Sequence, residues 1–191
     1  MIKAILLAAG QSKRLKGENK LIKNFKNKPL INHSLDALIK SKIDKIIIVL
    51  GYQSKDIKQK IKKNKKICFV NNKNYKKGMS SSIKCGLKKI NNKDKGFIIA
   101  QSDMPYIKST DINKIYNSII KRQKLVHAPV FKNILGNPIG FDISLKKKFN
   151  AISGKFGAKF MVQRLKDATN YIKISSKKSF KDIDRKSDFR A

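Results

Sequence analysis

Residues 1–22 read MIKAILLAAGQSKRLKGENKLI, and this stretch decides the fold. The apolar run Ile2–Leu7 has the length of a buried strand, and the small residues of the Ala8–Gly10 segment follow it at once. Five cationic side chains, counting Lys3, then fall within the first twenty positions. A strand that runs into a small-residue loop is typical of the first βα connection of an α/β domain.

The rest of the chain repeats this alternation of short apolar runs and longer amphipathic stretches. The expected strands are Ile2–Leu7, Lys45–Leu50, Ile67–Val70, Gly96–Ala100, Val126–Val130, Pro138–Phe141 and Tyr171–Ile174. The expected helices are Leu30–Ser41, 54–64, Ser80–Ile90, 109–124, Ser144–Phe149 and Ala158–Leu165. Alternation at this spacing predicts an α/β fold with a mostly parallel, twisted sheet, in a single domain that spans residues 1–191.

The composition is strongly basic, with a formal net charge of +34 over 191 residues. Only five of the 46 basic residues are Arg, and the lysines are spread through every segment instead of forming one stripe. Base readout and phosphate forks favour Arg, so we interpret the charge as a solvated surface and disfavour a nucleic-acid-binding role. No apolar stretch approaches the ~20 residues of a membrane span, and we expect a mature, cytoplasmic protein that does not bind membranes.

The segment after the first strand has the chemistry of an anion-binding loop. Small residues let backbone N–H groups approach a bound phosphate closely, Ser12 adds a hydroxyl, and Arg14 and Lys20 add positive charge. The segment lacks the Walker A pattern and the GxGxxG fingerprint. The residues alone also permit an ordinary βα turn with solvated cations, and both interpretations stay open at this point.

A carboxylate follows the fourth expected strand in Asp103-Met104-Pro105. An Asp at the carboxyl end of a parallel strand is well placed to bind Mg²⁺, which usually takes one or two carboxylates together with substrate phosphates. An ordinary turn Asp is the alternative.

A third polar segment, residues 71–82 (NNKNYKKGMSSS), follows the third expected strand. Gly78 and a run of serines at a helix N-terminus offer N–H and hydroxyl donors to a sugar, base or phosphate. A helix cap preceded by a turn glycine explains the same residues, and taken alone that explanation is the better one.

These motifs together resemble the MobA-like nucleotidyltransferases. LAAGQSKRLKGENKL is similar to the signature L-A-A-G-x-S-x-R-M-G-x-x-K-L, QSDMP to the D-x-P metal motif, and VNNKNYKKGMSSSIKCGL to N-x-x-W-x-x-G-M-x-x-S-L-x-x-G-L. The resemblance covers nearly the whole chain and is greatest to the molybdenum cofactor cytidylyltransferases. It implies a Rossmann-like, three-layer, GT-A-like fold and a Mg²⁺-dependent enzyme that moves a nucleoside monophosphate from an NTP to a phosphorylated acceptor, releasing pyrophosphate.

The resemblance also implies roles for individual residues. Arg14 would neutralise the departing pyrophosphate, Lys20 would lie by the α-phosphate, and Asp103, with Asp184 as a second carboxylate, would hold Mg²⁺. The implied nucleotide-binding residues are Leu7, Ala8, Ala9, Gly10, Ser12, Arg14, Lys20, Asn71, Gly78, Met79, Ser80 and Ser82, and the implied acceptor-binding residues are Asn137 and Pro138. Within the family L-A-A-G accompanies cytidylyl transfer, so Ala9 favours CTP. The implied acceptor is molybdopterin or the molybdenum cofactor, and transient contact with a molybdoenzyme or its chaperone would follow.

Several positions depart from the family pattern, mainly in the part expected to hold the acceptor. Lys16 stands where the family has Gly, Lys155 replaces an Asp, and Lys159 replaces an Arg. Residues 185–187 (RKS) replace Thr-Pro-Glu in the D-I-D-T-P-E-D motif. The alternatives are therefore a guanylyl- or sugar-phosphate nucleotidyltransferase, a non-catalytic nucleotide binder, and a basic nucleic-acid-binding protein.

Overall fold

The computed structural model describes residues 1–15 and 18–190, so the departure at Lys16, with Gly17 after it, lies outside the described residues. The strands are β1 (Ile2–Ala8), β2 (Asn24–Phe25), β3 (Lys28–Pro29), β4 (Lys45–Leu50), β5 (Ile67–Asn71), β6 (Gly96–Gln101), β7 (Val126–Phe131), β8 (Ile134–Leu135), β9 (Ile139–Asp142) and β10 (Thr169–Lys173). Every expected strand is present within two residues at each end, whereas β2, β3 and β8 were not expected.

The α-helices are α1 (Leu30–Ile39), α2 (Ser54–Gln59), α3 (Met79–Leu87), α4 (Ser109–Lys121) and α5 (Ala158–Arg164). The 3₁₀ segments are η1 (Lys13–Leu15), η2 (Tyr75–Lys77), η3 (Ile143–Ala151), η4 (Lys177–Phe180) and η5 (Lys186–Arg190). The expected helix over 54–64 ends early, at Gln59, because the lysine-rich chain beyond Ile61 has no further apolar side chain to bury before β5. The helix expected near 144–149 has 3₁₀ geometry.

The main sheet has the order β10-β7-β9-β6-β1-β4-β5, and the short strand β8 pairs antiparallel with the end of β7. The pairs β6–β1, β1–β4, β4–β5 and β10–β7 are parallel, while β9 runs antiparallel to both β6 and β7. The prediction of an α/β fold with a mostly parallel sheet is confirmed.

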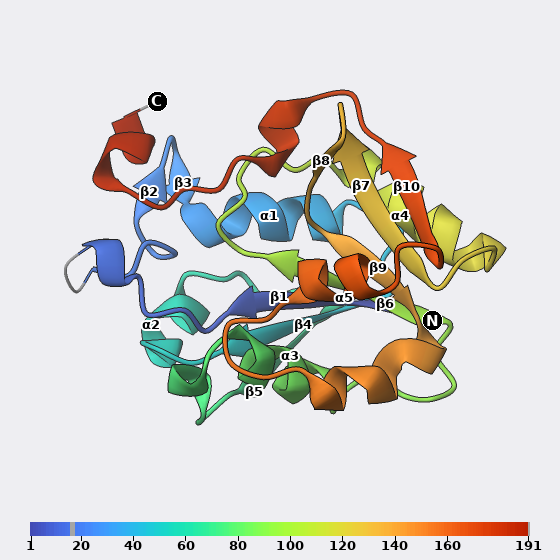
Figure 1. Cartoon of the computed structure of the whole chain (residues 1–191). Helices are drawn as coiled ribbons and strands as arrows, with labels where there is room; N and C mark the ends of the chain where they lie inside the picture. Colours follow the sequence, from blue (N-terminus) through green and yellow to red (C-terminus); the bar gives the residue numbers. More distant parts are fainter. Residues whose placement is uncertain (16–17, 191) are drawn as a thin grey trace.

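The central strands are apolar on both faces because helices cover both. In β4, Ile46, Ile48 and Leu50 pack on the face with α1, α2 and α4, while Ile47 and Val49 pack on the opposite face with α3, η3 and α5. Figure 1 shows α1 and α3 on opposite sides of the sheet. This three-layer arrangement explains why KIIIVL reads as a continuous apolar run without alternation.

The arrangement of strands also predicts where a ligand binds. The chain builds the sheet outward from β1 toward β5 and then returns to the other side of β1 with β6, so strand order reverses between β1 and β6. Ligands of open α/β sheets bind at the carboxyl ends of the strands at such a point. The antiparallel strand β9 starts at this same edge, which brings Asn137 and Pro138, joined by a cis peptide bond, beside the end of β6.

The last segment of the chain crosses the same edge. Strand β10 runs in the same direction as β6, so residues 174–190 start at the carboxyl edge of the sheet. They return to β6, where the Ile183 N–H donates to the Asp103 carbonyl oxygen at 3.0 Å. Among the described residues, no helix combines the length and the apolar character that crossing a bilayer requires.

Candidate active site

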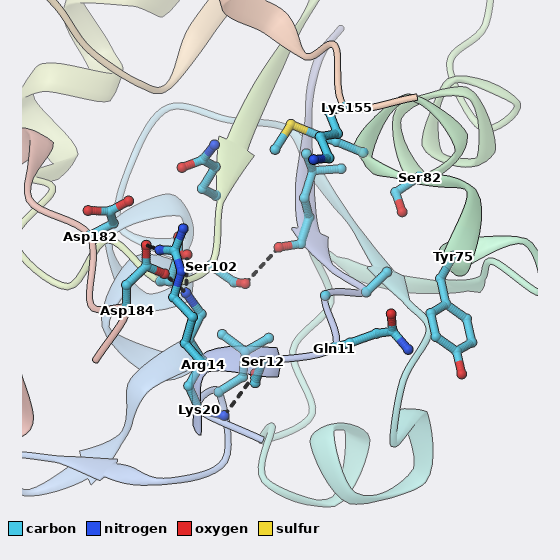
Figure 2. Close-up of a pocket in the computed structure, with 18 of the residues that line it drawn as sticks. Gln11, Ser12, Arg14, Lys20, Tyr75, Ser82, Ser102, Lys155, Asp182 and Asp184 are labelled. Atoms are coloured by element: carbon cyan, nitrogen blue, oxygen red, sulfur yellow. Dashed lines mark hydrogen bonds and ion pairs between the residues drawn. The ribbon is translucent and has the colours of Figure 1, made fainter. Parts of the chain in front are cut away.

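A cavity of about 630 Å³ opens at the carboxyl ends of β1 and β6. Residues from five separate segments line it, and Figure 2 shows how they face each other. Arg14, Lys20, Asp182 and Asp184 lie together on one side, whereas Tyr75 and Ser82 lie on the other side, with Gln11 between the two groups. The cavity therefore has a charged end, where cations and carboxylates meet, and an end with Tyr75 and Ser82, where the charged lining residues are the lysines Lys76 and Lys155.

The loop after β1 is held in shape by its own serine. Ser12 adopts a left-handed backbone conformation (φ 49°), and its carbonyl oxygen accepts from the Leu15 N–H at 2.8 Å. Its Oγ accepts from the backbone N–H of Lys20 at 3.1 Å, which fixes the start of the Lys20 side chain relative to the loop. A Cβ added to Gly10 would have no described atom within 4 Å, so the glycine surface faces the open cavity.

The loop before α3 has a different organising residue from the one we expected. Asn71 is exposed at the end of β5, while the buried neighbour Asn72 donates through Nδ2 to Ser81 Oγ at 2.9 Å and to Ser82 Oγ at 3.0 Å. Gly78 has a φ of 101°, and a Cβ there would lie 2.4 Å from the carbonyl oxygen of Gly154. Gly78 thus allows two loops to touch, and this contact shapes one wall of the cavity.

Lys20 is the centre of the charged end. Its Nζ lies 2.6 Å from Asp103 Oδ2 and 2.5 Å from Asp184 Oδ1, and Arg14 approaches the other Asp184 oxygen at 2.5 Å. Burial on its own lowers the pKa of Lys20, but Asp103 and Asp184 outweigh this effect and raise the pKa, so the side chain stays protonated. Lys20 is therefore not a solvated cation, whereas the side chain of Arg14 is 69% exposed.

Three carboxylates, Asp103, Asp182 and Asp184, form what we call the acidic cluster, in which one oxygen of each lies within 4.8 Å of the others. Although Asp182 is exposed, partial loss of hydration, and then the charges of Asp184 and Asp103, raise the pKa of its carboxyl. Asp103 Oδ1 is buried and has no hydrogen-bond partner in the described part of the chain. An unpartnered buried oxygen beside two more carboxylates fits the oxygen ligands that Mg²⁺ prefers.

A second, smaller cavity of about 280 Å³ adjoins the first. The two cavities share Leu7, Met79, Gln101, Lys155 and Asp182. The second is also lined by Asn137 and Lys159, whereas Pro138 does not line it.

The structure brings most of the residues expected from the sequence to these cavities. Those that line the first are Leu7, Ala9, Gly10, Ser12, Arg14, Lys20, Gly78, Met79, Ser82, Asp103 and Asp184. Ala8, Asn71 and Ser80 line neither cavity: Ala8 and Ser80 are buried, and the Ser80 N–H donates to the Gly154 carbonyl oxygen.

Other lining residues were missed, and some of them had a signal in the sequence. Tyr75 stands where the family motif has Trp, Gln101 and Ser102 precede Asp103 in QSDMP, and Asp182 is the first acid of the D-I-D element. Gln11 had no separate signal, since it occupies a variable position of the loop motif.

Comparison with known families agrees with this geometry. The family model of the MobA-like NTP transferase domain matches residues 4–169. The chain belongs to this family. The matched region contains the β1 loop, Lys20, Asp103 and the Gly78–Ser82 loop, but stops before Asp182 and Asp184. The second and third carboxylates of the acidic cluster thus come from outside the matched region.

The curated relatives of this MobA-like chain are distant. The bifunctional protein GlmU of Clostridioides difficile (strain 630) is 27% identical over 147 residues, which make up 76% of this chain and 31% of that protein. The GlmU of Buchnera aphidicola subsp. Schizaphis graminum is 28% identical over 183 residues, 94% of this chain and 38% of that protein. The chain thus spans about a third of the length of these relatives.

Solved structures share the fold over nearly the whole chain. Rv0371c from Mycobacterium tuberculosis H37Rv superposes with a TM-score of 0.86 at 17% identity, covering 99% of this chain and 95% of that one, and its complex with manganese gives 0.80 at 16%, covering 99% and 96%. The 4-diphosphocytidyl-2C-methyl-D-erythritol synthase of Anaerococcus prevotii gives 0.77 at 18% identity, covering 99% and 92%. At these identities the likeness shows the fold alone.

Proposed function

We propose that the chain transfers a nucleoside monophosphate from an NTP, with CTP favoured, to a phosphorylated acceptor, and that molybdopterin or the molybdenum cofactor is the first acceptor to test. One observation carries the proposal. A single cavity at the switch point of the sheet combines the small-residue loop, two cations and the acidic cluster. Nucleotidyl transfer needs these groups, because its catalysis consists mainly of positioning the substrates and neutralising phosphate charge.

The two ends of the cavity suit the two ends of a nucleotide. The charged end, with Arg14 and Lys20, suits the triphosphate, while the end with Tyr75 and Ser82 suits the ribose and base. Gly10 and its neighbours would let backbone N–H groups approach the phosphates, since a glycine presents no side chain there.

In the proposed reaction, a phosphate oxygen of the acceptor attacks the α-phosphorus and the bond to the β-phosphate oxygen breaks, so pyrophosphate leaves. Lys20 stabilises the charge that grows at the α-phosphate, and Arg14 stabilises the departing pyrophosphate. Asp103 and Asp184, with Asp182 as a further ligand, would hold Mg²⁺, which supplies charge neutralisation when bound. A phosphate nucleophile is already ionised at neutral pH, so no general base is needed.

The acceptor would bind in the second cavity, next to Asn137. Lys155 lines both cavities, so its ammonium can reach an anionic group of the acceptor near the nucleotide. Lys159 adds a second cation to the acceptor side. This pair of lysines favours an anionic acceptor.

A sugar phosphate is the second candidate acceptor. The second cavity, at about 280 Å³, is less than half the size of the first, which suits a small phosphorylated molecule.

The preference for CTP has two supports. Ala9 lines the nucleotide cavity, and the A. prevotii synthase is named for a cytidyl product. Guanylyl transfer from GTP is the alternative that the experiment must distinguish from cytidylyl transfer. We also propose that the protein acts in the cytoplasm.

The proposed activity is tested by combining each nucleoside triphosphate with each candidate acceptor. The protein is incubated with Mg²⁺, each of the four ribonucleoside triphosphates in turn, and either molybdenum cofactor or a panel of sugar phosphates, and pyrophosphate release is measured. We expect release with CTP and molybdenum cofactor. Release with GTP alone would refute the choice of base, release with a sugar phosphate alone would refute the first acceptor, and no release in any combination would refute the proposed activity.

A further inference from the structure

The ammonium group of Lys20 lies where the acidic cluster converges. Its Nζ donates to Asp103 Oδ2 at 2.6 Å, to Asp184 Oδ1 at 2.5 Å and to the Ile183 carbonyl oxygen at 3.0 Å. An ammonium has three N–H donors, so these contacts use all of them. Lys20 held in this way has no donor to offer a phosphate, although its place beside the β1 loop suits phosphate binding.

We propose that Lys20 is the internal counter-ion of the acidic cluster, and that a divalent cation displaces it toward the phosphates of the nucleotide. The inference rests on the metal site put forward under the proposed function. It assigns Lys20 two alternating partners: Asp103 and Asp184 before the cation binds, and nucleotide phosphate afterwards.

Competition for the same carboxylates is the first argument. A Mg²⁺ ion bound by carboxylates lies about 2.1 Å from its ligand oxygens. The Lys20 ammonium already lies at hydrogen-bond distance from one oxygen of Asp103 and one of Asp184. Two cations bound to the same pair of carboxylates repel each other strongly, even if the metal takes the unpartnered Asp103 Oδ1, and screening by water is weak because the side chains of Lys20 and Asp103 are only 14% and 19% exposed.

The second argument is that the contacts of Lys20 with Asp103 and Asp184 are not needed to hold the acidic cluster in place. The segment around Ile183 is held to β6 by its own N–H, which donates to the Asp103 carbonyl oxygen at 3.0 Å. The Asp184 N–H is bonded to Asp188 Oδ2 at 2.9 Å. Both bonds persist if the ammonium leaves, so the acidic cluster keeps its arrangement while its cation changes.

Coupling between nucleotide and metal follows from this exchange. Before nucleotide binds, an entering cation must displace an ammonium that would lose both of its carboxylate partners and keep only the Ile183 carbonyl oxygen, so Lys20 weakens metal binding. Nucleotide phosphates provide new acceptors for the ammonium and remove that obstacle. Because such coupling is reciprocal, bound metal also strengthens nucleotide binding.

The first experiment measures Mn²⁺ binding without nucleotide, by the electron paramagnetic resonance signal of free Mn²⁺. We expect Lys20→Met to bind Mn²⁺ about tenfold more tightly than the wild type, because one competing positive charge is gone. Lys20→Arg keeps the charge and should bind as weakly as the wild type. Arg14→Met is the matched control: it also removes one charge from Asp184, but Arg14 is 69% exposed and contacts only one carboxylate, so the gain should stay within about threefold.

The second experiment uses the wild-type protein and does not depend on a variant that folds. Acetylation of each lysine is measured by mass spectrometry with and without saturating Mn²⁺. Displacement of Lys20 should raise its acetylation several-fold. Lys66, whose Nζ donates to the carbonyl oxygens of Ile39 and Ser41, serves as a tethered lysine remote from the cluster and should not respond.

The results separate this inference from the proposed function. If Lys20→Met binds Mn²⁺ no more tightly than the Arg14→Met control, or if Mn²⁺ leaves Lys20 acetylation unchanged or lowers it, the exchange is refuted. Neither measurement requires turnover. Tighter Mn²⁺ binding by Lys20→Met would therefore support the exchange even if no triphosphate yielded pyrophosphate, and that latter result would refute only the transferase activity.

Discussion

The two sides of the site are built in different ways. The nucleotide side uses the ends of the parallel strands β1, β5 and β6, and the buried strands β1 and β6 fix where most of its side chains lie. The acceptor side uses the start of the antiparallel strand β9, the loop of residues 153–157 with the start of α5, and residues 177–184, which include η4. The side built on the core retains the family motifs, whereas the other side carries the substitutions Lys155, in the loop before α5, and Lys159, in the first turn of α5. Acceptor choice can therefore change without altering the fold.

The largest expected effect tests the acidic cluster, where the two sides meet. Asp103→Asn should lower kcat about a thousandfold, because it removes the charge of the one cluster carboxylate that follows a core strand. Metal-dependent pyrophosphate release is the measurement. The control is Asp36→Asn: Asp36 lies on α1, pairs with Lys28 of β3 and lines neither cavity, so this variant should retain activity. If Asp103→Asn kept most of its activity, the assigned metal ligand would be wrong.

Lys20 tests the nucleotide side directly. Lys20→Met should lower kcat about a hundredfold with little change in the KM for the nucleotide, because the ammonium acts mainly on charge that develops in the transition state. The matched control is Lys23→Met, which removes a charge three residues away that pairs with Glu18 outside the cavity. A rise in KM with unchanged kcat would instead assign Lys20 to ground-state binding.

His127 tests the stability of the sheet on the acceptor side. It is buried on β7, and loss of hydration lowers its pKa to about 4, while an unfolded chain has the usual value of 6.5. The unfolded state therefore binds more protons between these values, so the free energy of unfolding is highest above pH 6.5 and falls as the pH drops toward 4, by about 3 kcal/mol.

Denaturant unfolding from pH 7.5 to 4 measures this loss of stability. His127→Asn should flatten the slope relative to the wild type, whatever its own stability, while the contribution of His33 remains in both proteins. An equal slope in the two proteins would show that His127 does not control the acid sensitivity.

Two glycines distinguish binding from stability on the nucleotide side. Gly10→Ala should raise the KM for the nucleotide about tenfold and leave Tm unchanged, because the new methyl group would meet only the open cavity. Gly78→Ala should lower Tm instead, since it combines a positive φ with a clash against the Gly154 carbonyl. If Gly10→Ala changed neither binding nor stability, the phosphates would not lie against this loop.

How much of this the sequence predicted depends on the same division between core and irregular chain. KIIIVL and GFIIAQ were predicted almost to the residue, because strands buried on both faces show continuous apolar runs bounded by turn residues. The β1 loop and Asp103 followed from their places after such strands. The single-domain organisation stays a prediction.

The rest required tertiary information. Asp182 reaches the acidic cluster only because the chain after β10 returns across the sheet edge, and no local pattern shows that path. Asn71 and Asn72 are adjacent in sequence, and only the structure shows that Asn72 points inward to the serines. The end of α2 at Gln59 depends on which side chains find a surface to pack against, which outweighs helix propensity.

A substitution of Lys155 has the smallest expected effect. It tests whether the acceptor side acts separately from the nucleotide side. Lys155→Asp, which restores the family residue, should raise the KM for the acceptor about fivefold and leave the KM for the nucleotide almost unchanged. The reason is that an exposed lysine at a cavity rim contributes at most about 1 kcal/mol, which corresponds to a factor of five. Lys147→Asp makes the same change of charge on η3, outside both cavities, and controls for the general field of a protein with net charge +34. Equal effects of the two substitutions would mean that overall charge, and not Lys155, attracts the acceptor. A change confined to the nucleotide KM would mean that the two sides of the site are not separate, since Lys155 lines both cavities.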